Sequence, residues 1–420
     1  MNSLPFSKIR SFVLIFSVVL LSLGIGYQYG VRNSKTFTSA SNTSLSGTAS
    51  PSAIDFGLFW DVWGRLNRDF IDAKSIDVKK MVYGAIGGMV ASLDDPYTSF
   101  LPPKENKEFK EDIGGAFEGI GAQLGLKESR VMVIAPLKGN PAEKAGIRAG
   151  DFILKVNDED TAGWSVQQAV SKIRGPRGTE VKLGIFHDGS REPVDITITR
   201  ATIEVPSVET WIKSPEDISE ISKFPESVRL SGKVTYLRLT RFGDRTDDEW
   251  NKAVKEISQS LRNGARGVIF DLRNNPGGYL EGAVYIGSEF IASGTVVTQT
   301  NSNGSKIDYP VNRTGNLLSA PIVVLVNKGS ASAAEIVAGA LRDFKRATIV
   351  GETTFGKGSV QTPEELRDGS SLHVTTGKWL LPKGDWIHKK GIKPDFEVKW
   401  DGLEASGDAQ LAKAVELLLK

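Results

Sequence analysis

Residues 321–341 read PIVVLVNKGSASAAEIVAGAL, and this stretch decides the fold. Residues 321–326 form a continuous apolar run, which is typical of a strand buried on both faces. A polar turn follows at 327–332, and a helix is expected from 333 to 341. A buried strand, a short turn and a helix together predict one unit of a parallel sheet whose faces are covered by helices.

A second segment repeats this pattern. Residues 267–291 read GVIFDLRNNPGGYLEGAVYIGSEFI, in which an apolar strand at 267–272 leads into a glycine-containing turn at 273–278 and a helix candidate at 279–291. Active sites of open α/β sheets lie beyond the carboxyl ends of the strands. We therefore expect this turn and the turn at 327–332 to lie together at a site.

Ser332 stands where the helix after the first strand should begin. The first N–H groups of a helix have no acceptor within it, so they point outward. A serine there can attack a carbonyl carbon while a neighbouring amide stabilises the oxyanion. From this segment alone, an N-cap role for Ser330 or Ser332 is the simpler interpretation.

Lys357 favours the interpretation of Ser332 as a nucleophile over that of an N-cap. It lies in TTFGKGSVQ, residues 353–361, after a strand-like run at 347–351. Burial disfavours the charged ammonium, and a neutral lysine can accept the proton of a serine. Gln361 is expected to hydrogen-bond this amine and orient it. The string resembles a phosphate-binding loop only superficially, because Gly358 stands where that loop has Ser or Thr.

A β-rich unit is predicted over residues 113–202. Strand-like runs lie at 130–135, 151–156, 181–186 and 194–200, and a helix candidate at 165–173. The unit opens with FEGIGA, whose two glycines free the backbone to turn its N–H groups toward a carboxylate. A plain glycine turn is the alternative interpretation of this string. Binding of a peptide C-terminus is predicted at Gly119, Ile120, Gly121 and Ala122.

The N-terminus is expected to direct the chain to the membrane. Lys8 and Arg10 precede residues 12–31, which carry no charge and are long enough to span a bilayer. Residues 1–31 are predicted to be a signal-anchor helix, with a cleaved signal peptide as the alternative. Residues 32–53 are rich in Ser, Thr, Asn and Ala and predict a flexible linker. Both interpretations place the rest of the chain outside the cytoplasm.

Residues 54–112 are predicted to be helical. An apolar stripe at helical spacing is expected to pack against another surface, and it comprises Phe56, Phe59, Trp60, Trp63, Leu66 and Phe70. Residues 203–420, the largest region, contain both strand-and-helix units and are predicted to be the catalytic domain.

Composition excludes several classes of protein. The 420 residues carry 52 basic and 50 acidic side chains, a balance that does not indicate a nucleic-acid-binding surface. There are no cysteines, so thiol catalysis, thiolate metal sites and disulfides are excluded. The three histidines have no metal-ligand spacing. His187 falls within the β-rich unit, and His373 and His388 follow Ser332. No cofactor or metal is expected, and a trypsin-like His-Asp-Ser enzyme is disfavoured.

Together these motifs resemble the carboxyl-terminal processing peptidases, also called tail-specific proteases, over residues 54 to about 400. The strings that carry the resemblance are LDDPYT (93–98), FEGIGA (117–122), DLRNNPGG (271–278), GSASAAEI (329–336), TFGKGSVQ (354–361) and GIKPD (391–395). Within the β-rich unit, NPAEKAGIRAGD (140–151) and IRGPRG (173–178) resemble PDZ domains. One departure is Ala334, where many relatives have serine.

The resemblance implies a role for each matching residue. It implies Ser332 as nucleophile, Lys357 as general base and Gln361 as its support. It implies the amide of Ala333 as one oxyanion donor and that of Gly277 or Gly278 as the other, without choosing between the two. The fold expected is an α/β, Clp protease- and crotonase-like peptidase domain with an inserted PDZ domain and an N-terminal helical segment.

The resemblance also implies substrates and partners. The substrates would be exported proteins that the PDZ domain binds by their C-terminal tails, and PDZ occupancy would gate cleavage. A homo-oligomer or an activating adaptor stays open. A PDZ scaffold with an inactive peptidase domain is the non-enzymatic alternative, and the intact set of Ser332, Lys357 and Gln361 argues against it.

Overall fold

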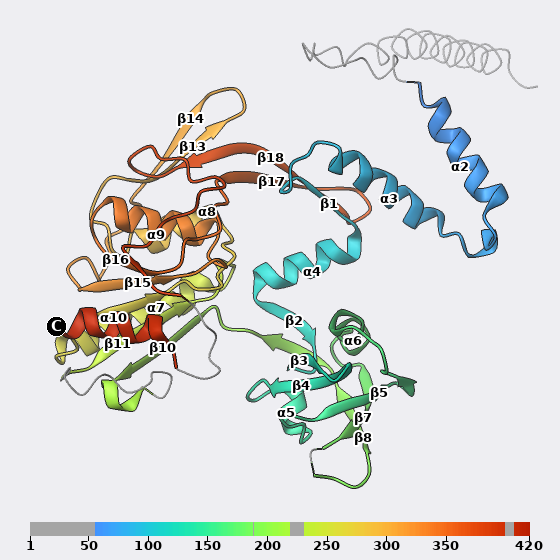
Figure 1. Ribbon diagram of the computed structural model, residues 1–420, viewed down its shortest axis with the longest axis horizontal. Coiled ribbons are helices and arrows are strands. Elements are labelled where there is room, and N and C mark those ends of the chain that lie inside the picture. Colours follow the sequence, from blue (N-terminus) through green and yellow to red (C-terminus); the bar gives the residue numbers. More distant parts are fainter. Residues whose placement is uncertain (1–54, 188, 219–230, 400–406) are drawn as a thin grey trace, which may run out of the picture. The chain divides into compact units, whose positions relative to one another are not determined.

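The computed structural model describes residues 55–187, 189–218, 231–399 and 407–420 (Figure 1). The chain divides into two units, residues 1–78 and 79–420. The predicted anchor and linker, residues 1–31 and 32–53, lie outside the described residues. No helix within the described ranges has both the length and the apolar character that a bilayer span requires.

The described residues of the N-terminal unit contain helix α2 (Gly57–Asp69) and a short 3-10 turn, η2 (Ala73–Ser75). The helix predicted from the apolar stripe is therefore present. Its aromatic rings contact one another, and the ring centroid of Phe59 lies 5.0 Å from that of Trp60 and 6.0 Å from that of Trp63. None of the residues of α2 is buried within this unit.

Helix α3 (Val78–Ala91), all but its first residue, and helix α4 (Pro103–Gly114) open the second unit and flank the short strand β1 (Ser99–Leu101). Proline suits the first position of α4, because the N–H that proline lacks would have no partner within the helix. The helix ends at Gly115, whose φ of 66° is a left-handed conformation that glycine adopts without steric cost.

A β-rich unit is inserted between β2 (Ala116–Gly119) and β9 (Ala201–Glu204), which pair antiparallel and form a two-stranded stem. Beyond the stem lies a six-stranded sheet in the order β3-β4-β5-β7-β8, with β6 paired to β5. Its elements are β3 (Ala122–Lys127), β4 (Arg130–Pro136), α5 (Pro141–Lys144), β5 (Phe152–Val156), β6 (Glu159–Asp160), α6 (Val166–Ile173), β7 (Glu180–Phe186) and β8 (Val194–Thr199). The strands and the helix predicted in this region are present, around a core of their own.

The largest sheet has the order β10-β11-β12-β15-β16-β19. The strands are β10 (Val208–Lys213), β11 (Val234–Leu239), β12 (Val268–Asp271), β15 (Ile322–Val326), β16 (Thr348–Gly351) and β19 (Phe396–Glu397). The last five run parallel to one another, and β10 is antiparallel to β11. The parallel sheet predicted from the two apolar runs is confirmed.

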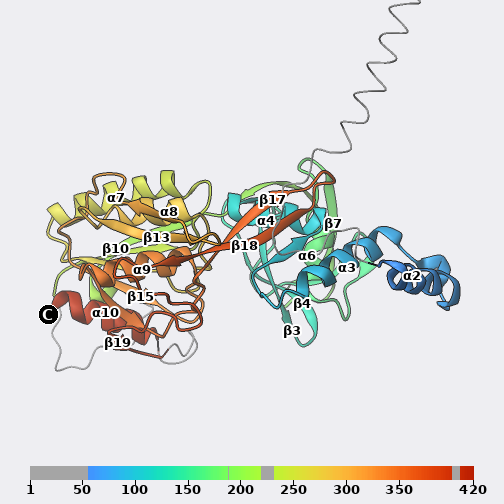
Figure 2. The same cartoon turned by 90° about the horizontal axis from the view of Figure 1, so that it is seen from above.

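Helices cover both faces of this sheet (Figure 2). On one face lie α7 (Thr246–Arg262), α8 (Leu280–Gly287) and α9 (Ala333–Asp343), and the fully buried Trp250 of α7 contacts Phe270 of the sheet at 5.3 Å between ring centroids. On the other face lies α10 (Ala409–Leu419). Burying one such large side chain contributes about 1.5–3 kcal/mol.

A second, antiparallel sheet has the order β1-β18-β13-β14, with β17 also paired to β18. Its strands are β13 (Thr295–Asn301), β14 (Lys306–Pro310), β17 (Ser359–Glu365) and β18 (Ser371–Leu380), together with β1. The pairing of Phe100 with Leu372 joins the helical start of this unit to the catalytic region. The predicted α/β class, with an inserted β-rich domain and N-terminal helices, is confirmed.

Candidate active site

Three loops meet at the carboxyl end of the parallel sheet. Strands β12, β15 and β16 are direct neighbours, with Asp271 opposite Leu325 and Val326 opposite Gly351. The loops that follow these three strands therefore emerge side by side. They carry, in order, the double glycine, Ser332 and Lys357. The first two lie together as the two strand-to-turn patterns predict.

Ser332 has an unusual backbone conformation. It is the residue before the first turn of α9, with φ 55° and ψ −118°. A positive φ is uncommon for a residue with a side chain, and such conformations are frequent at functional sites. The next amide, that of Ala333, is the first N–H of the helix and has no acceptor within it.

Ser330, the other serine of this loop, has a structural role. Its hydroxyl donates to the carbonyl oxygen of Leu272 at 2.8 Å and accepts the N–H of Asn327 at 3.0 Å. Ser330 is fully buried, whereas Ser332 is only partly buried. The two serines therefore differ in exposure, and Ser332 is the one that can be reached from solvent.

Glu335 joins the serine loop to the lysine loop. Its Oε2 accepts the N–H groups of Ser332 and Lys357, each at 2.9 Å. Its Oε1 accepts the hydroxyl of Thr354 at 2.5 Å and the N–H of Gly356 at 2.7 Å. Burial raises the pKa of Glu335, and these four hydrogen bonds oppose that rise. The sequence indicates no partner for this carboxylate, because its contacts lie up to 22 residues away.

Lys357 is half-buried beside an aromatic ring. Burial lowers the pKa of Lys357, and the negative charges of Asp95 and Glu335 oppose this shift. The Lys357 Nζ lies 5.4 Å from the centre of the Tyr97 ring. Tyr97 is held in place by Asp95, which accepts its N–H at 3.2 Å. The string at residues 93–98 is apparent in the sequence, but nothing in it indicates that Tyr97 lies against the lysine.

Gln361 lies on β17, close to the lysine loop, but its side chain does not bond the lysine in the described residues. Its side-chain amide donates to Ser359 Oγ at 2.9 Å and to Thr375 Oγ1 at 3.1 Å. In the part of the chain that the structure describes, Lys357 is not among its hydrogen-bond partners, although the sequence predicts that contact.

The double glycine packs directly against the serine. A Cβ on Gly277 would lie 2.8 Å from the Cβ of Ser332 and 2.9 Å from the amide nitrogen of Ala333. A Cβ on Gly278 would collide with the carbonyl oxygen of Phe242. Both residues have positive φ, 100° and 139°, so only glycine fits here without strain.

The two glycine amides differ. The N–H of Gly277 donates to Asn275 Oδ1 at 2.8 Å. For the N–H of Gly278, the described residues show no acceptor. Asn275 is itself fully buried and donates to the carbonyl of Leu239 at 2.7 Å. This second bond fixes the side chain that accepts the N–H of Gly277.

The glycine turn of the β-rich unit is also held through its carbonyls. The carbonyl of Ile120 accepts the N–H of Ala142 at 2.8 Å, and that of Gly121 accepts the N–H of Leu137 at 2.9 Å. Gly121 has φ 76°, and a Cβ there would lie 2.5 Å from the Cβ of Asn140. These two hydrogen bonds and the close packing at Gly121 fix the conformation of the turn. Ala122 then begins β3, the edge strand of this sheet.

His373 is packed into the structure. It is 8% exposed, lies on β18, and its ring meets that of Phe109 edge-on at 4.8 Å. Its Nε2 lies 3.0 Å from Ser371 Oγ. Burial lowers the pKa of His373, and so does the nearby charge of Lys357.

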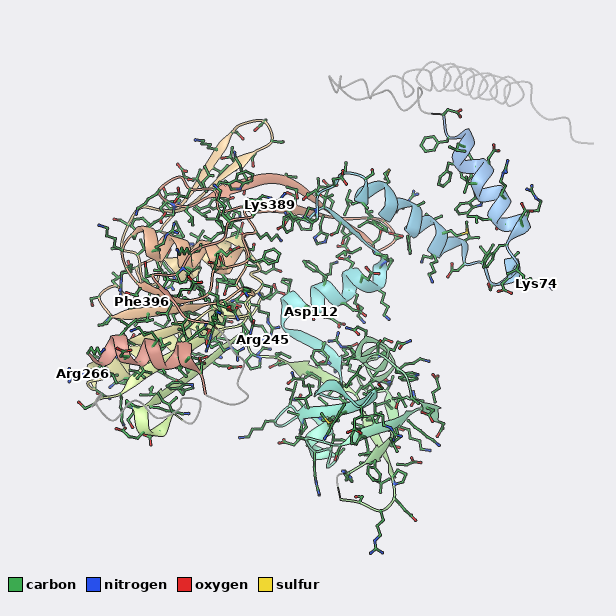
Figure 3. The ribbon with its side chains drawn as sticks, in the orientation of Figure 1. Lys74, Asp112, Arg245, Arg266, Lys389 and Phe396 are labelled. Carbon is green, nitrogen blue, oxygen red and sulfur yellow. The ribbon has the colours of Figure 1, made fainter. Side chains whose placement is uncertain are left out.

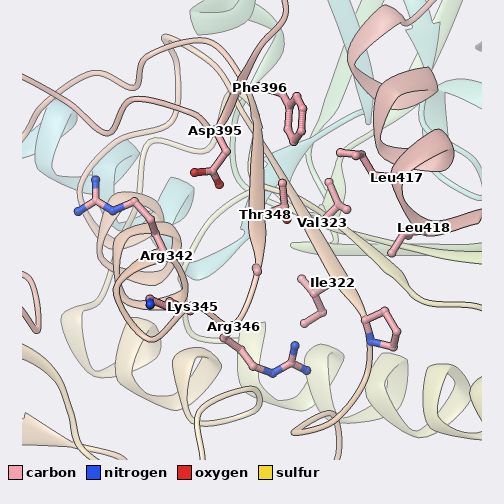
Figure 4. A pocket seen from close by; sticks show the side chains of 12 residues that line it. Ile322, Val323, Arg342, Lys345, Arg346, Thr348, Asp395, Phe396, Leu417 and Leu418 are labelled. Atoms are coloured by element: carbon pink, nitrogen blue, oxygen red, sulfur yellow. The ribbon is translucent and has the colours of Figure 1, made fainter. Parts of the chain in front are cut away.

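A separate pocket of about 570 Å³ lies at the opposite end of the parallel strands (Figure 4). The first residues of β15 and β16 line it, together with the end of α9 and Leu417 and Leu418 of α10. Its arginines are already engaged: Arg346 donates to the carbonyls of Phe290, Leu317 and Ala320. None of the predicted site residues lines this pocket.

Comparison with known proteins identifies the family to which this chain belongs. Residues 233–398 match the sequence model of peptidase family S41, and residues 109–186 match that of the PDZ domain. The carboxy-terminal processing protease CtpA of Bacillus subtilis is 40% identical over 375 residues, which cover 88% of this chain and 75% of that protein. The chain belongs to the carboxy-terminal processing proteases of family S41.

Two further similarities agree with this S41 protease assignment. The carboxy-terminal processing protease CtpB of Bacillus subtilis is 34% identical, covering 82% of this chain and 68% of that protein. A crystal structure from Bacteroides fragilis, described as that of an S41 protease, has a TM-score of 0.53 and 17% identity and covers 84% of this S41 protease and 95% of that chain, a likeness of fold. The protein is thus a carboxy-terminal processing serine protease with a PDZ domain.

Proposed function

We propose that this S41 protease cleaves exported proteins with a Ser332–Lys357 dyad, after its PDZ domain has bound their C-terminal tails. The observation that carries the proposal is the shared carboxylate of Glu335. It accepts the amides of Ser332 and Lys357 on one oxygen and so holds the two loops together. A nucleophile and a base on separate loops need such a link to keep a productive distance.

The acylation step follows from the chemistry of these groups. Neutral Lys357 takes the proton of Ser332 Oγ, and this oxygen attacks the carbonyl carbon of the scissile bond. The negative charge that develops on the carbonyl oxygen needs donors placed at the start of α9. Protonated Lys357 then gives its proton to the leaving amine, and the carbon–nitrogen bond breaks. An ester between the acyl group and Ser332 remains.

Deacylation runs the same chemistry with water. Lys357, neutral again, takes a proton from a water molecule, which attacks the ester carbonyl. The tetrahedral intermediate collapses, the proton returns to Ser332 Oγ, and the product carboxylate leaves. Burial of Lys357 favours this cycle, because it lowers the pKa of the ammonium and so enlarges the neutral fraction.

We assign the oxyanion donors to the amides of Ala333 and Gly278. The amide of Gly277 is already engaged by Asn275, whereas the described residues offer the Gly278 amide no acceptor. Ala333 supplies the first N–H of an eleven-residue helix, whose dipole also favours negative charge at this end.

The PDZ turn supplies recognition in this proposal. The amides of Gly119, Ile120, Gly121 and Ala122 would bind the terminal carboxylate, and β3 would pair with the extended tail. For location, the uncharged run at residues 12–31 supports a single-pass membrane anchor with the catalytic body outside the cytoplasm. Sequencing the N-terminus of the protein purified from membranes tests this: an intact N-terminus supports the anchor, and a new start near residue 40 supports a cleaved signal peptide.

One assay tests the function as a whole. The full chain is purified as wild type, Ser332→Ala and Lys357→Ala, and each is incubated with an unfolded protein that carries or lacks an apolar C-terminal tail. Cleavage by the wild type alone, faster with the tail, is the expected result. Equal cleavage by all three proteins would overturn the dyad, and equal rates with and without the tail would overturn tail recognition.

A further inference from the structure

The stem of the PDZ domain and the glycine loop of the active site are both anchored to one short segment, residues 241–244, which we call the connector. The connector follows β11 and precedes α7. In space the connector lies next to the end of α4, at Gly114, and next to the end of β9, at Glu204. These are the two points at which the chain leaves the catalytic region for the PDZ domain and returns from it.

Arg241 binds both of these crossing points. Its Nη1 donates to the carbonyl of Asp112 at 3.4 Å, and its Nη2 donates to the carbonyl of Val205. A guanidinium can hold two acceptors at fixed separation because its donors form a rigid fork. In Figure 3, Asp112 marks the end of α4 at this junction and Arg245 marks the start of α7 just after the connector.

The connector backbone also touches the outgoing segment directly. A Cβ on Gly243 would collide with the carbonyl oxygen of Ile113. Side chains cannot be inserted between these two backbones, so a shift of one must displace the other. The connector is therefore held on the PDZ side by Arg241 and by close packing at Gly243.

On its other side the connector holds the glycine loop. Phe242 donates its N–H to the carbonyl of Gly277 and accepts the N–H of Tyr279, both at 2.9 Å. These two bonds bracket Gly278. A third link lies close by, since the hydroxyl of Tyr279 donates to Asp244 Oδ1 at 2.8 Å. Phe242 is fully buried, so this attachment is sheltered from water.

We infer that Arg241 is a positioning residue for catalysis, which holds the amide of Gly278 in place through Phe242 and ties it to both crossings of the PDZ stem. The inference rests on the proposed function, in which the Gly278 amide is an oxyanion donor. A displacement of about 1 Å at such a donor can lower the rate roughly a hundredfold. The catalytic loop thus depends on a side chain that touches neither substrate nor Ser332.

The test compares Arg241→Gln with Arg245→Gln in the full chain. Arg245 is a matched control, because it pairs with Glu204 of the same stem at 2.7 Å and with Glu249 at 3.2 Å, but is not bonded to the glycine loop. Five quantities are measured for each protein: kcat and KM on a tail-bearing substrate, the Kd of a labelled tail peptide, the pH dependence of kcat, and the temperature of thermal unfolding.

The expected result for Arg241→Gln is a fall in kcat of about tenfold or more, with KM and the tail-peptide Kd within about twofold of wild type. The midpoint of the pH profile stays in place, because Lys357 is untouched. Arg245→Gln stays within about twofold of wild type in kcat, as expected for a partly exposed ion pair. A kcat for Arg241→Gln within about twofold of wild type, or a loss confined to tail affinity, would overturn the inference.

A second variant keeps the inference testable if Arg241→Gln does not fold. Tyr279→Phe removes only the hydroxyl that bonds Asp244, from a side chain that is 46% exposed. A fall in kcat of about threefold or more at unchanged KM is expected, and an unchanged kcat would contradict the connector's role. Cleavage by Ser332→Ala would overturn the proposed function. A normal kcat for the Arg241 and Tyr279 variants, in an enzyme that Ser332→Ala silences, would overturn the positioning role alone.

Discussion

The amides of Ser332 and Lys357 donate to the same atom, Glu335 Oε2, and each does so at 2.9 Å. The proposed nucleophile and base come from loops after neighbouring strands, 25 residues apart in sequence. One carboxylate therefore sets the relative position of the two loops.

Glu335→Gln should lower both activity and stability. An amide in place of the carboxylate presents N–H groups to donors, so two of the four hydrogen bonds are lost in a buried site. We expect the free energy of unfolding to fall by about 1–3 kcal/mol and kcat to fall more than KM changes. Urea unfolding and steady-state kinetics measure this. The exposed Glu364→Gln is the control, and equal behaviour of the two variants would contradict the bridging role.

The pH profile should report Lys357. Since burial lowers the pKa of Lys357, kcat should rise with pH and reach half its maximum below the pKa of a free lysine. Asp95 opposes that lowering, so Asp95→Asn should move the midpoint to lower pH. The neighbouring Asp94→Asn is the control, because asparagine tolerates the φ of 52° at this position. A midpoint that moves upward in Asp95→Asn would contradict the account.

Burial of the Lys357 ammonium should lower the free energy of unfolding. In the folded state its pKa lies below the unfolded value, so the unfolded chain binds more protons between the two values and stability rises with pH across that window. The cost of burial is therefore full below the folded pKa. Lys357→Met should be inactive yet unfold at higher temperature than wild type at neutral pH, and the difference should shrink as pH rises. A lower unfolding temperature for Lys357→Met at neutral pH would argue against a destabilising charge.

Gly278→Ala should nearly abolish turnover. A Cβ would collide with Phe242, and the φ of 139° is unfavourable for alanine, so the amide must move. Loss of one oxyanion donor typically lowers kcat by about 10²–10³. Gly304→Ala on the β13–β14 hairpin is the control, because φ there is also positive, at 82°, but the space is open. Similar kcat values for both variants would count against Gly278 as a donor.

Gly121→Ala should weaken tail binding. A Cβ there would lie 2.5 Å from the Cβ of Asn140 and would distort the turn that is proposed to bind the carboxylate. We expect the Kd of a labelled tail peptide, measured by fluorescence anisotropy, to rise about tenfold or more. Gly163→Ala, in the same domain with φ 78° and open space, is the matched control. Unchanged affinity in Gly121→Ala would place the carboxylate elsewhere.

Much of this site could be predicted from local sequence, because each catalytic loop follows a continuous apolar strand. The run at 321–326 and the turn after it suffice to place Ser332 at a helix start, and the two glycines around Lys357 mark its loop. The choice between Gly277 and Gly278 could not be made, because it depends on Asn275, whose side chain folds back onto its own loop.

Other features depend on contacts between distant segments. Tyr97 lies against Lys357 although 260 residues separate them in sequence, and no periodicity indicates such a meeting. The same holds for Arg241, which binds backbone carbonyls of Asp112 and Val205. Backbone carbonyls are present at every residue, so a side chain that binds them leaves no recognisable partner in the sequence.

The most direct test of the dyad is to trap the acyl-enzyme. Reactions of wild type, Lys357→Ala and Ser330→Ala with a tail-bearing substrate are quenched in acid within one turnover, and the acylated residue is located by peptide mass mapping. The account predicts the acyl group on Ser332 in wild type and in Ser330→Ala, and none in Lys357→Ala. An acyl group on another residue, or undiminished acylation without Lys357, would contradict it.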